Sequence, residues 1–184
     1  MSYKRWLLIS ASLFGLGLVL GLSTPASTTI LLPEQVAIIE EFAKILAQLP
    51  QLSILVIILI KNVSALLISF ALSPFFGLMP ILALVLNGWL LGVISIAVLE
   101  EQSLGYLLAG LLPHGIFELP ALIMGEAVAL SFGTAVLLTL FKKEGRKLLL
   151  PNLRQNLRYL TLALILLLPA AIIETYVTPL ILDS

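Results

Sequence analysis

The sequence predicts an all-α protein: a polytopic bundle of transmembrane helices. Of its 184 residues, 60% are hydrophobic and 11% are charged, whereas soluble domains carry about 25% charged residues. The mean hydropathy is +1.16, and the apolar residues form several runs near the roughly 20 residues that a helix needs to cross a bilayer. We therefore expect one integral membrane domain over residues 1–184, with about five full spans plus one broken, partly inserted segment.

Residues 1–30 hold the first span and a polar loop. Lys4 and Arg5 precede an apolar run from Trp6 to Leu22, and small residues follow it. This pattern resembles a signal peptide, but the run of about 17 residues exceeds the usual hydrophobic core of about 7–15 residues. Because every later segment is also membrane-embedded, we expect this first span to be retained.

Residues 33–49 predict an amphipathic helix that lies on the membrane surface. Ile38, Phe42, Ile45 and Leu49 recur at helical spacing, opposite charged side chains. The membrane bundle then occupies residues 52–182. Its further full spans are expected at Leu52–Leu72, Leu78–Leu99, Glu118–Phe141 and Leu157–Leu182.

One apolar segment, Leu104–Leu112, is too short to cross the bilayer. The sequence Pro113-His114-Gly115 follows it and predicts a helix break, because proline lacks the backbone N–H and clashes with the preceding turn. Broken helices are tolerated at membrane depth where they face protein or water. We expect this segment to begin and end on the outer side of the membrane, because a full crossing would place either the basic residues 142–158 or the pair Lys4 and Arg5 outside.

The charge distribution predicts the orientation of the spans. Residues 142–158 carry six basic residues and one acidic residue, and loops rich in Lys and Arg stay in the cytoplasm. Placing this loop and the pair Lys4 and Arg5 inside leaves Glu100 and Glu101 outside. The expected location is the cell membrane, crossed several times, with a cytoplasmic N-terminus and an extracellular C-terminus.

Ionisable and polar side chains within the spans are the candidates for function, because a charge at the bilayer centre costs at least about 2.5 kcal/mol. The motif Leu-Leu-Pro-x-x-Ile-x-Glu occurs at residues 111–118 and again at 167–174. Glu126 and Glu174 lie equally far from the basic loop, so we expect them to face each other. The candidate polar site comprises Lys61, Asn87, His114, Glu118, Glu126 and Glu174.

Three interpretations of this site stay open. In the first, the carboxylates and His114 hold a proton or a cation, since carboxylate oxygens suit hard cations and imidazole admits zinc or manganese. In the second, they form a structural clamp with Lys61. In the third, they bind backbone groups freed by Pro113 and Pro169. With one histidine, no cysteine and no protease motif, the protein is not expected to be an enzyme; an intramembrane metal-dependent enzyme is the alternative.

Three stretches carry a family resemblance. Residues 86–92 (LNGWLLG), 112–121 (LPHGIFELPA) and 174–179 (ETYVTP) resemble the stage II sporulation protein M family, over Asn62 to Leu180. The resemblance implies a polytopic membrane protein with a shared polar site at Asn87, His114, Glu118 and Glu174. In endospore formers, members of this family are membrane partners of peptidoglycan-degrading proteins during engulfment. The family also occurs in organisms that do not form spores.

Two functions follow from these observations. As a scaffold, the protein would dock other membrane or envelope proteins and keep its charges paired internally. As a transporter or channel for a small solute or ion, it would hold a solvent-reachable cavity around the polar site. The lipid bilayer is a partner in either case. Nucleic acid is not expected to be one, because no basic tract with interleaved aromatic residues is present.

The topology is testable with cysteines introduced into this cysteine-free chain. A cysteine in the basic loop, residues 142–158, should be protected from an impermeant thiol reagent in intact cells. A cysteine at Ser184 should react. Labelling of the loop from outside would overturn the five-span arrangement, because the six basic residues would then lie on the wrong side of the membrane.

Overall fold

The computed structural model describes residues 3–24, 48–141 and 145–182, and every regular element in these ranges is a helix. Within them, five segments are long and apolar enough to cross a membrane, which confirms the predicted fold class. The surface helix expected at residues 33–49 falls, up to residue 47, outside the described residues. The elements are α1 (Tyr3–Leu22), α3 (Gln51–Leu72), α4 (Leu78–Glu101), α5 (Leu104–Phe141), α6 (Gly145–Ile172), the π-helix η2 (Ile173–Val177) and α7 (Thr178–Leu182).

Helices α1 and α4 pack so closely that their backbones touch. A Cβ atom added to Gly88 would lie 2.2 Å from the carbonyl oxygen of Phe14, and one added to Gly21 would lie 3.0 Å from the Cα atom of Gly92. These contacts advance in the same direction along both helices, so α1 and α4 run parallel. Small residues spaced four apart allow such an approach between membrane helices. The pairs that provide it are Gly17 with Gly21 and Gly88 with Gly92.

Helices α3 and α5 also run parallel. Asn62 lies beside Glu118, and Ser69, two turns later, lies beside Glu126. Helices α5 and α6 form a hairpin that brings the start of α5 close to the end of α7. These directions agree with spans that cross the membrane alternately along the chain. The assignment of either end to the cytoplasm stays a prediction.

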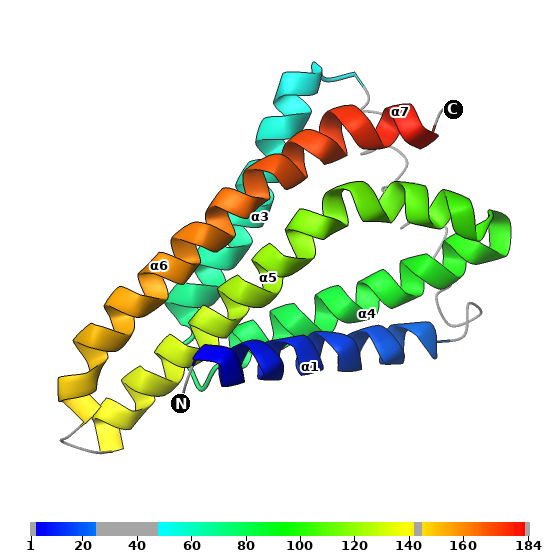
Figure 1. Ribbon diagram of the computed structural model, residues 1–184. Helices are drawn as coiled ribbons and strands as arrows, with labels where there is room; N and C mark the ends of the chain where they lie inside the picture. Colours follow the sequence, from blue (N-terminus) through cyan, green and yellow to red (C-terminus); the bar gives the residue numbers. More distant parts are fainter. Residues whose placement is uncertain (1–2, 25–47, 142–144, 183–184) are drawn as a thin grey trace.

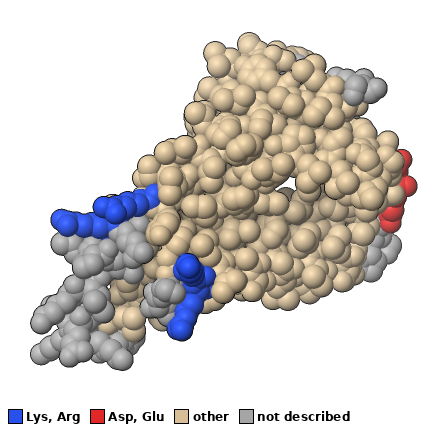
Figure 2. All heavy atoms as spheres, in the orientation of Figure 1, with Lys and Arg blue, Asp and Glu red and all other residues tan. Residues whose placement is uncertain are grey.

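The two ends of the bundle carry opposite charges. Tyr3 stacks on Tyr159 with the ring centroids 3.7 Å apart, which places Lys4 and Arg5 near the exposed Arg158. Figure 2 shows the visible Lys and Arg side chains gathered at one end of the molecule and the visible Glu side chains at the other. We call these the basic end and the acidic end. Helix α4 closes at the acidic end with Glu100 and Glu101.

Helix α5 continues through the site of the expected break. Its 38 residues form one helix with Pro113 and Pro120 inside it, and Figure 1 shows that it bends in its first part. A proline removes one backbone hydrogen bond and presses on the preceding turn, which kinks a helix but need not end it. The predicted break is therefore a bend, and the segment Leu104–Leu112 is the first part of the fourth span.

The fourth span is longer than a bilayer requires. Residues Leu104–Thr139 number 36, which corresponds to about 54 Å at roughly 1.5 Å per residue, against a hydrocarbon core of about 30 Å. The first part of α5 carries an exposed apolar stripe at four-residue spacing. Its members are Leu104, Leu108, Leu112 and Ile116. The bend thus leaves an apolar face uncovered by protein near the acidic end.

Helices α3 and α4 join at the basic end and then separate. The connection at residues 73–77 is tight, and Phe76 and Gly77 have positive φ angles of 56° and 66°. Beyond this turn α4 packs mainly on α1, whereas α3 packs mainly on α5 and α6. Figure 1 shows α4 with α1 diverging from α6 toward the acidic end. Toward the acidic end, a cavity lined by α3, α4 and α5 lies between the separated helices.

The contact between α1 and α4 should be sensitive to a single methyl group. The substitution Gly88→Ala places a Cβ atom against the Phe14 carbonyl, and we expect it to destabilise the protein by about 1–3 kcal/mol, as overpacking does. The control is Gly15→Ala, because nothing lies within 4 Å of a Cβ atom at that position. Melting temperatures in detergent measure both. Equal stability of the two variants would contradict the contact.

Candidate functional site

Two adjoining cavities lie between α3, α4 and α5. The larger has a volume of about 230 Å³, and the smaller, about 110 Å³, lies toward the bend of α5. They share Asn87, Glu118 and Leu122, and we refer to both together as the polar cleft. The polar residues that line the cleft are Lys61, Asn62, Asn87, His114, Glu118 and Glu126. Five of the six candidate residues predicted from the sequence are therefore brought to one place.

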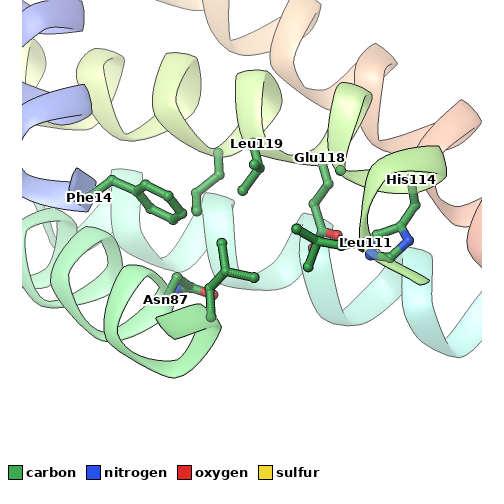
Figure 3. A pocket seen from close by; sticks show the side chains of 9 residues that line it. Phe14, Asn87, Leu111, His114, Glu118 and Leu119 are labelled. Atoms are coloured by element: carbon green, nitrogen blue, oxygen red, sulfur yellow. Dashed lines mark ion pairs between the residues drawn. The ribbon is translucent and has the colours of Figure 1, made fainter. Parts of the chain in front are cut away.

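Glu118 is at the centre of the polar cleft. Its Oε1 accepts a hydrogen bond of 3.3 Å from Nδ2 of Asn62, and its Oε2 lies 3.9 Å from Nε2 of His114, one turn earlier on α5. The carboxylate keeps 31% of its side-chain surface exposed. Figure 3 shows Glu118 and His114 of α5 on one side of the smaller cavity, with Phe14 and Asn87 on the other side. Glu118 is thus held by its neighbours yet open to the cavity.

Glu126 lies two turns deeper, at the inner end of the larger cavity. It is 1% exposed, and Oγ of Ser69 donates a hydrogen bond of 2.5 Å to its Oε2. Ser69 and Asn62 are seven residues apart, which is close to two helical turns, so both point from α3 toward α5. The sequence prediction did not include Ser69. Its spacing from Asn62 is the signal that could have identified it.

Glu174 reaches the site from an irregular part of the last span. Helix α6 continues through Pro169, and the π-helix η2 then contains Glu174. Such π-helical turns are frequent at functional sites. Glu174 interacts electrostatically with Glu118, His114 and Lys61. The expected facing of Glu174 and Glu126 is not observed: Glu118 is the carboxylate near Glu174, and Glu126 pairs with Ser69.

Two polar atoms near this region are buried without a hydrogen bond. They are Nδ1 of His114 and Oγ1 of Thr175, which follows Glu174 in η2. A buried polar group without a partner is unfavourable by about 1–3 kcal/mol. The imidazole therefore has one nitrogen directed to Glu118 and the other without a partner among the described atoms. This leaves unused hydrogen-bonding capacity beside the smaller cavity.

Lys61 and Asn87 stand at the mouth of the cleft. Both side chains are exposed, and each lies near the middle of its helix, α3 or α4. Nδ2 of Asn87 donates a hydrogen bond of 2.7 Å to the carbonyl oxygen of Ala83 in its own helix. Lys61 interacts with Glu174 electrostatically, but it makes no ion pair at contact distance with a described carboxylate. A tight Lys–Glu clamp is therefore not part of this arrangement.

The described part of the chain contains no group of three His, Asp or Glu side chains placed to hold a metal ion. Catalytic zinc usually has three protein ligands. The polar cleft instead combines carboxylates, amides and one imidazole around an open volume. This chemistry suits a positively charged or hydrogen-bonding ligand better than a transition metal.

Comparison with known proteins identifies the family. A sequence model of the family described as "Stage II sporulation protein M" matches residues 10–179. The chain belongs to this family. The match extends over most of α1, beyond the region in which the sequence alone shows the resemblance, and α1 packs on α4 within the bundle.

A relative from Methanocaldococcus jannaschii, described as an uncharacterised protein, is 32% identical over 123 residues, which cover 66% of this chain and 69% of the relative. No solved structure matches the chain. The comparisons thus establish a multi-pass membrane protein of the stage II sporulation protein M family.

Glu118 and Glu174 should be energetically coupled, because removing either charge relieves the same repulsion. In a double-mutant cycle of Glu118→Gln and Glu174→Gln, we expect an interaction energy of about 0.5–3 kcal/mol in unfolding free energy. Stability in detergent provides the measurement. The control pair is Glu118→Gln with Glu100→Gln at the end of α4, which should be additive within about 0.5 kcal/mol. Additivity of the first pair as well would disprove the coupling.

Proposed function

We propose that this member of the stage II sporulation protein M family is a membrane transporter that binds a small, positively charged or zwitterionic cargo in the polar cleft. The observation that carries the proposal is the placement of Glu118, Asn62, Asn87 and His114 around an open volume at mid-helix. Ionisable groups inside a membrane protein typically mark substrate or ion pathways. The carboxylates supply the negative charge that would attract such a cargo.

The shape of the molecule supports transport over a purely structural role. A scaffold has no need of an internal polar volume and would pair its charges in packed contacts. Here the charged groups line cavities, and Figure 2 shows an opening through the surface where, in Figure 1, the first part of α5 arches away from α4. Charged side chains at membrane depth almost always face the bundle interior or a water-filled cavity. The cleft provides such a cavity.

The inner half of the bundle is closed below the cleft. A Cβ atom added to Gly133 of α5 would lie 2.2 Å from the carbonyl oxygen of Ser73, and one added to Gly125 would lie 2.3 Å from the Leu66 side chain. This packing seals the space between Glu126 and the basic end. The structure thus resembles a state closed toward the basic end, and transport requires α3 and α5 to separate at these glycines.

Catalysis is not part of the proposal. The sequence offers no nucleophile motif, and the cleft presents its carboxylates with amides and one imidazole rather than with an activated serine or a set of metal ligands. Docking of other membrane proteins is the competing role. It predicts a dry, sealed interior, so accessibility of the cleft to water distinguishes the two.

The test uses single cysteines in the cysteine-free background. Ala65→Cys and Ala83→Cys line the larger cavity, and both should react with a membrane-impermeant, positively charged thiosulfonate reagent. The matched control is Ile60→Cys, next to Lys61 in sequence but exposed on the apolar surface of α3. It should not react, because a thiolate does not form in hydrocarbon.

Transport further requires that the same cysteines react from both sides of the membrane. In inverted vesicles, Ala65→Cys should be labelled more slowly than in right-side-out vesicles, because the inner half must open first. Labelling from one side alone would show a static pocket and overturn transport. Absence of labelling from both sides would show a dry interior and favour a scaffold.

A further inference from the structure

The polar cleft opens sideways, toward the lipid. Lys61 on α3 and Asn87 on α4 flank this opening, and both side chains are exposed although they lie near the middle of helices that cross the membrane. Behind them lie Glu118 and Glu126 of α5. An exposed charge at the bilayer centre is unfavourable by at least about 2.5 kcal/mol. Something polar must therefore occupy the opening for this arrangement to be stable.

A second copy of the chain is a poor occupant. A symmetric dimer places the same surface on both subunits, so an interface at this opening would bring both Lys61 ammonium groups to it. Among the described residues, no carboxylate forms an ion pair with Lys61 at contact distance. Two such ammonium groups would repel each other in a medium that screens charge weakly. The occupant should instead carry a negative group for Lys61.

The charges in the cleft are complementary to a zwitterion. Lys61 at the mouth offers an ammonium group, suited to a phosphate. Glu118, further inside, offers a carboxylate with 31% of its side chain exposed, suited to an amine. Asn87 and the unpartnered Nδ1 of His114 add hydrogen-bonding groups between α4 and α5. A phosphate joined to an amine by a short linker would meet both charges.

The size of the cleft indicates that only a head group enters. The two cavities measure about 230 Å³ and 110 Å³, which together reach only the lower end of the range of about 300–1,000 Å³ typical of pockets that enclose a whole small ligand. Beside the opening, α3 and α4 expose apolar side chains: Ile60 precedes Lys61, and Leu86 precedes Asn87. A ligand with long apolar chains would therefore keep them in the bilayer, between the separated helices α3 and α4.

We propose that the polar cleft binds the head group of a zwitterionic aminophospholipid, which enters sideways between α3 and α4 while its acyl chains stay in the bilayer. This inference rests on the proposed transport function and names its substrate class. The phosphate binds at Lys61 and the ammonium group at Glu118. The π-helical Glu174, which interacts with both Glu118 and Lys61, adds a second negative charge near the amine.

The experiment titrates the purified full-length protein in mixed micelles with phosphatidylethanolamine or phosphatidylglycerol of identical acyl chains, and follows binding by thermal shift and native mass spectrometry. We expect phosphatidylethanolamine to bind at least about tenfold more tightly, a difference of about 1.4 kcal/mol. Glu118→Gln should abolish this preference, because Glu118 contacts the amine. Lys61→Met should weaken the binding of both lipids, because both carry the phosphate, and Lys61→Arg should restore it. The control Lys4→Met removes a lysine at the basic end, outside the cleft, and should change nothing.

Three outcomes would overturn the inference. Equal affinity of the wild-type protein for phosphatidylethanolamine and phosphatidylglycerol would show that the cleft does not distinguish the head groups. Free phosphoethanolamine binding as tightly as the lipid would assign a soluble cargo and remove the sideways entry. A dimer that covers Lys61, detected by mass spectrometry, would make a second copy the occupant.

The lipid and transport proposals fail separately. Phosphatidylethanolamine should slow the labelling of Ala65→Cys, which lies in the cleft. If Ala65→Cys is labelled from both sides but the lipids bind equally, the lipid assignment fails and transport stands. If Ala65→Cys is not labelled from either side, the transport function itself fails.

Discussion

The backbone contact between α1 and α4 is the constraint on which the rest of the structure depends. Four glycines let these parallel helices touch, and they hold α4 against α1 rather than against α3. Helix α3 is instead held by α5 and α6. Helices α3 and α4 therefore diverge from the turn at residues 73–77 that joins them, and α5 packs against both. If α4 were free to pack on α3, the cleft would close and Lys61 would lie against Asn87.

The repeated Leu-Leu-Pro-x-x-Ile-x-Glu motif produces two different backbones that serve one site. In the first copy, Pro113 lies within α5, and His114 and Glu118 follow on one face. In the second, α6 runs on past Pro169, and the irregularity is the π-helix that holds Glu174. Both devices direct a carboxylate from a membrane helix toward the same region. The two copies of the motif thus share the position of their carboxylate but not their backbone conformation.

The sequence was sufficient for the number of spans, because apolar length is set by bilayer thickness, but not for the start of the fourth span, Leu104–Thr139. Lys61, Asn87, His114, Glu118 and Glu126, chosen from the sequence as candidates, all line the polar cleft, since polar groups in apolar runs tend to converge inside a bundle. The hydrogen bond between Ser69 and Glu126 could not be predicted in this way, because it depends on the rotation of α5 about its axis. That rotation follows from close packing at Gly125 and Gly133. The continuation of α5 through Pro113, in place of a break, likewise depends on how neighbouring helices support α5.

The excess length of α5 couples this protein to the thickness of its bilayer. A helix longer than the hydrocarbon core must tilt, kink or thicken the lipid around it, and α5 already bends in its first part. Its exposed leucines there offer an apolar surface over several turns. A thinner membrane would push the first part of α5 toward α4 and narrow the opening between the two helices. A thicker membrane would let the first part of α5 move away from α4. Lipid composition would then set the width of the cleft mechanically, apart from any ligand.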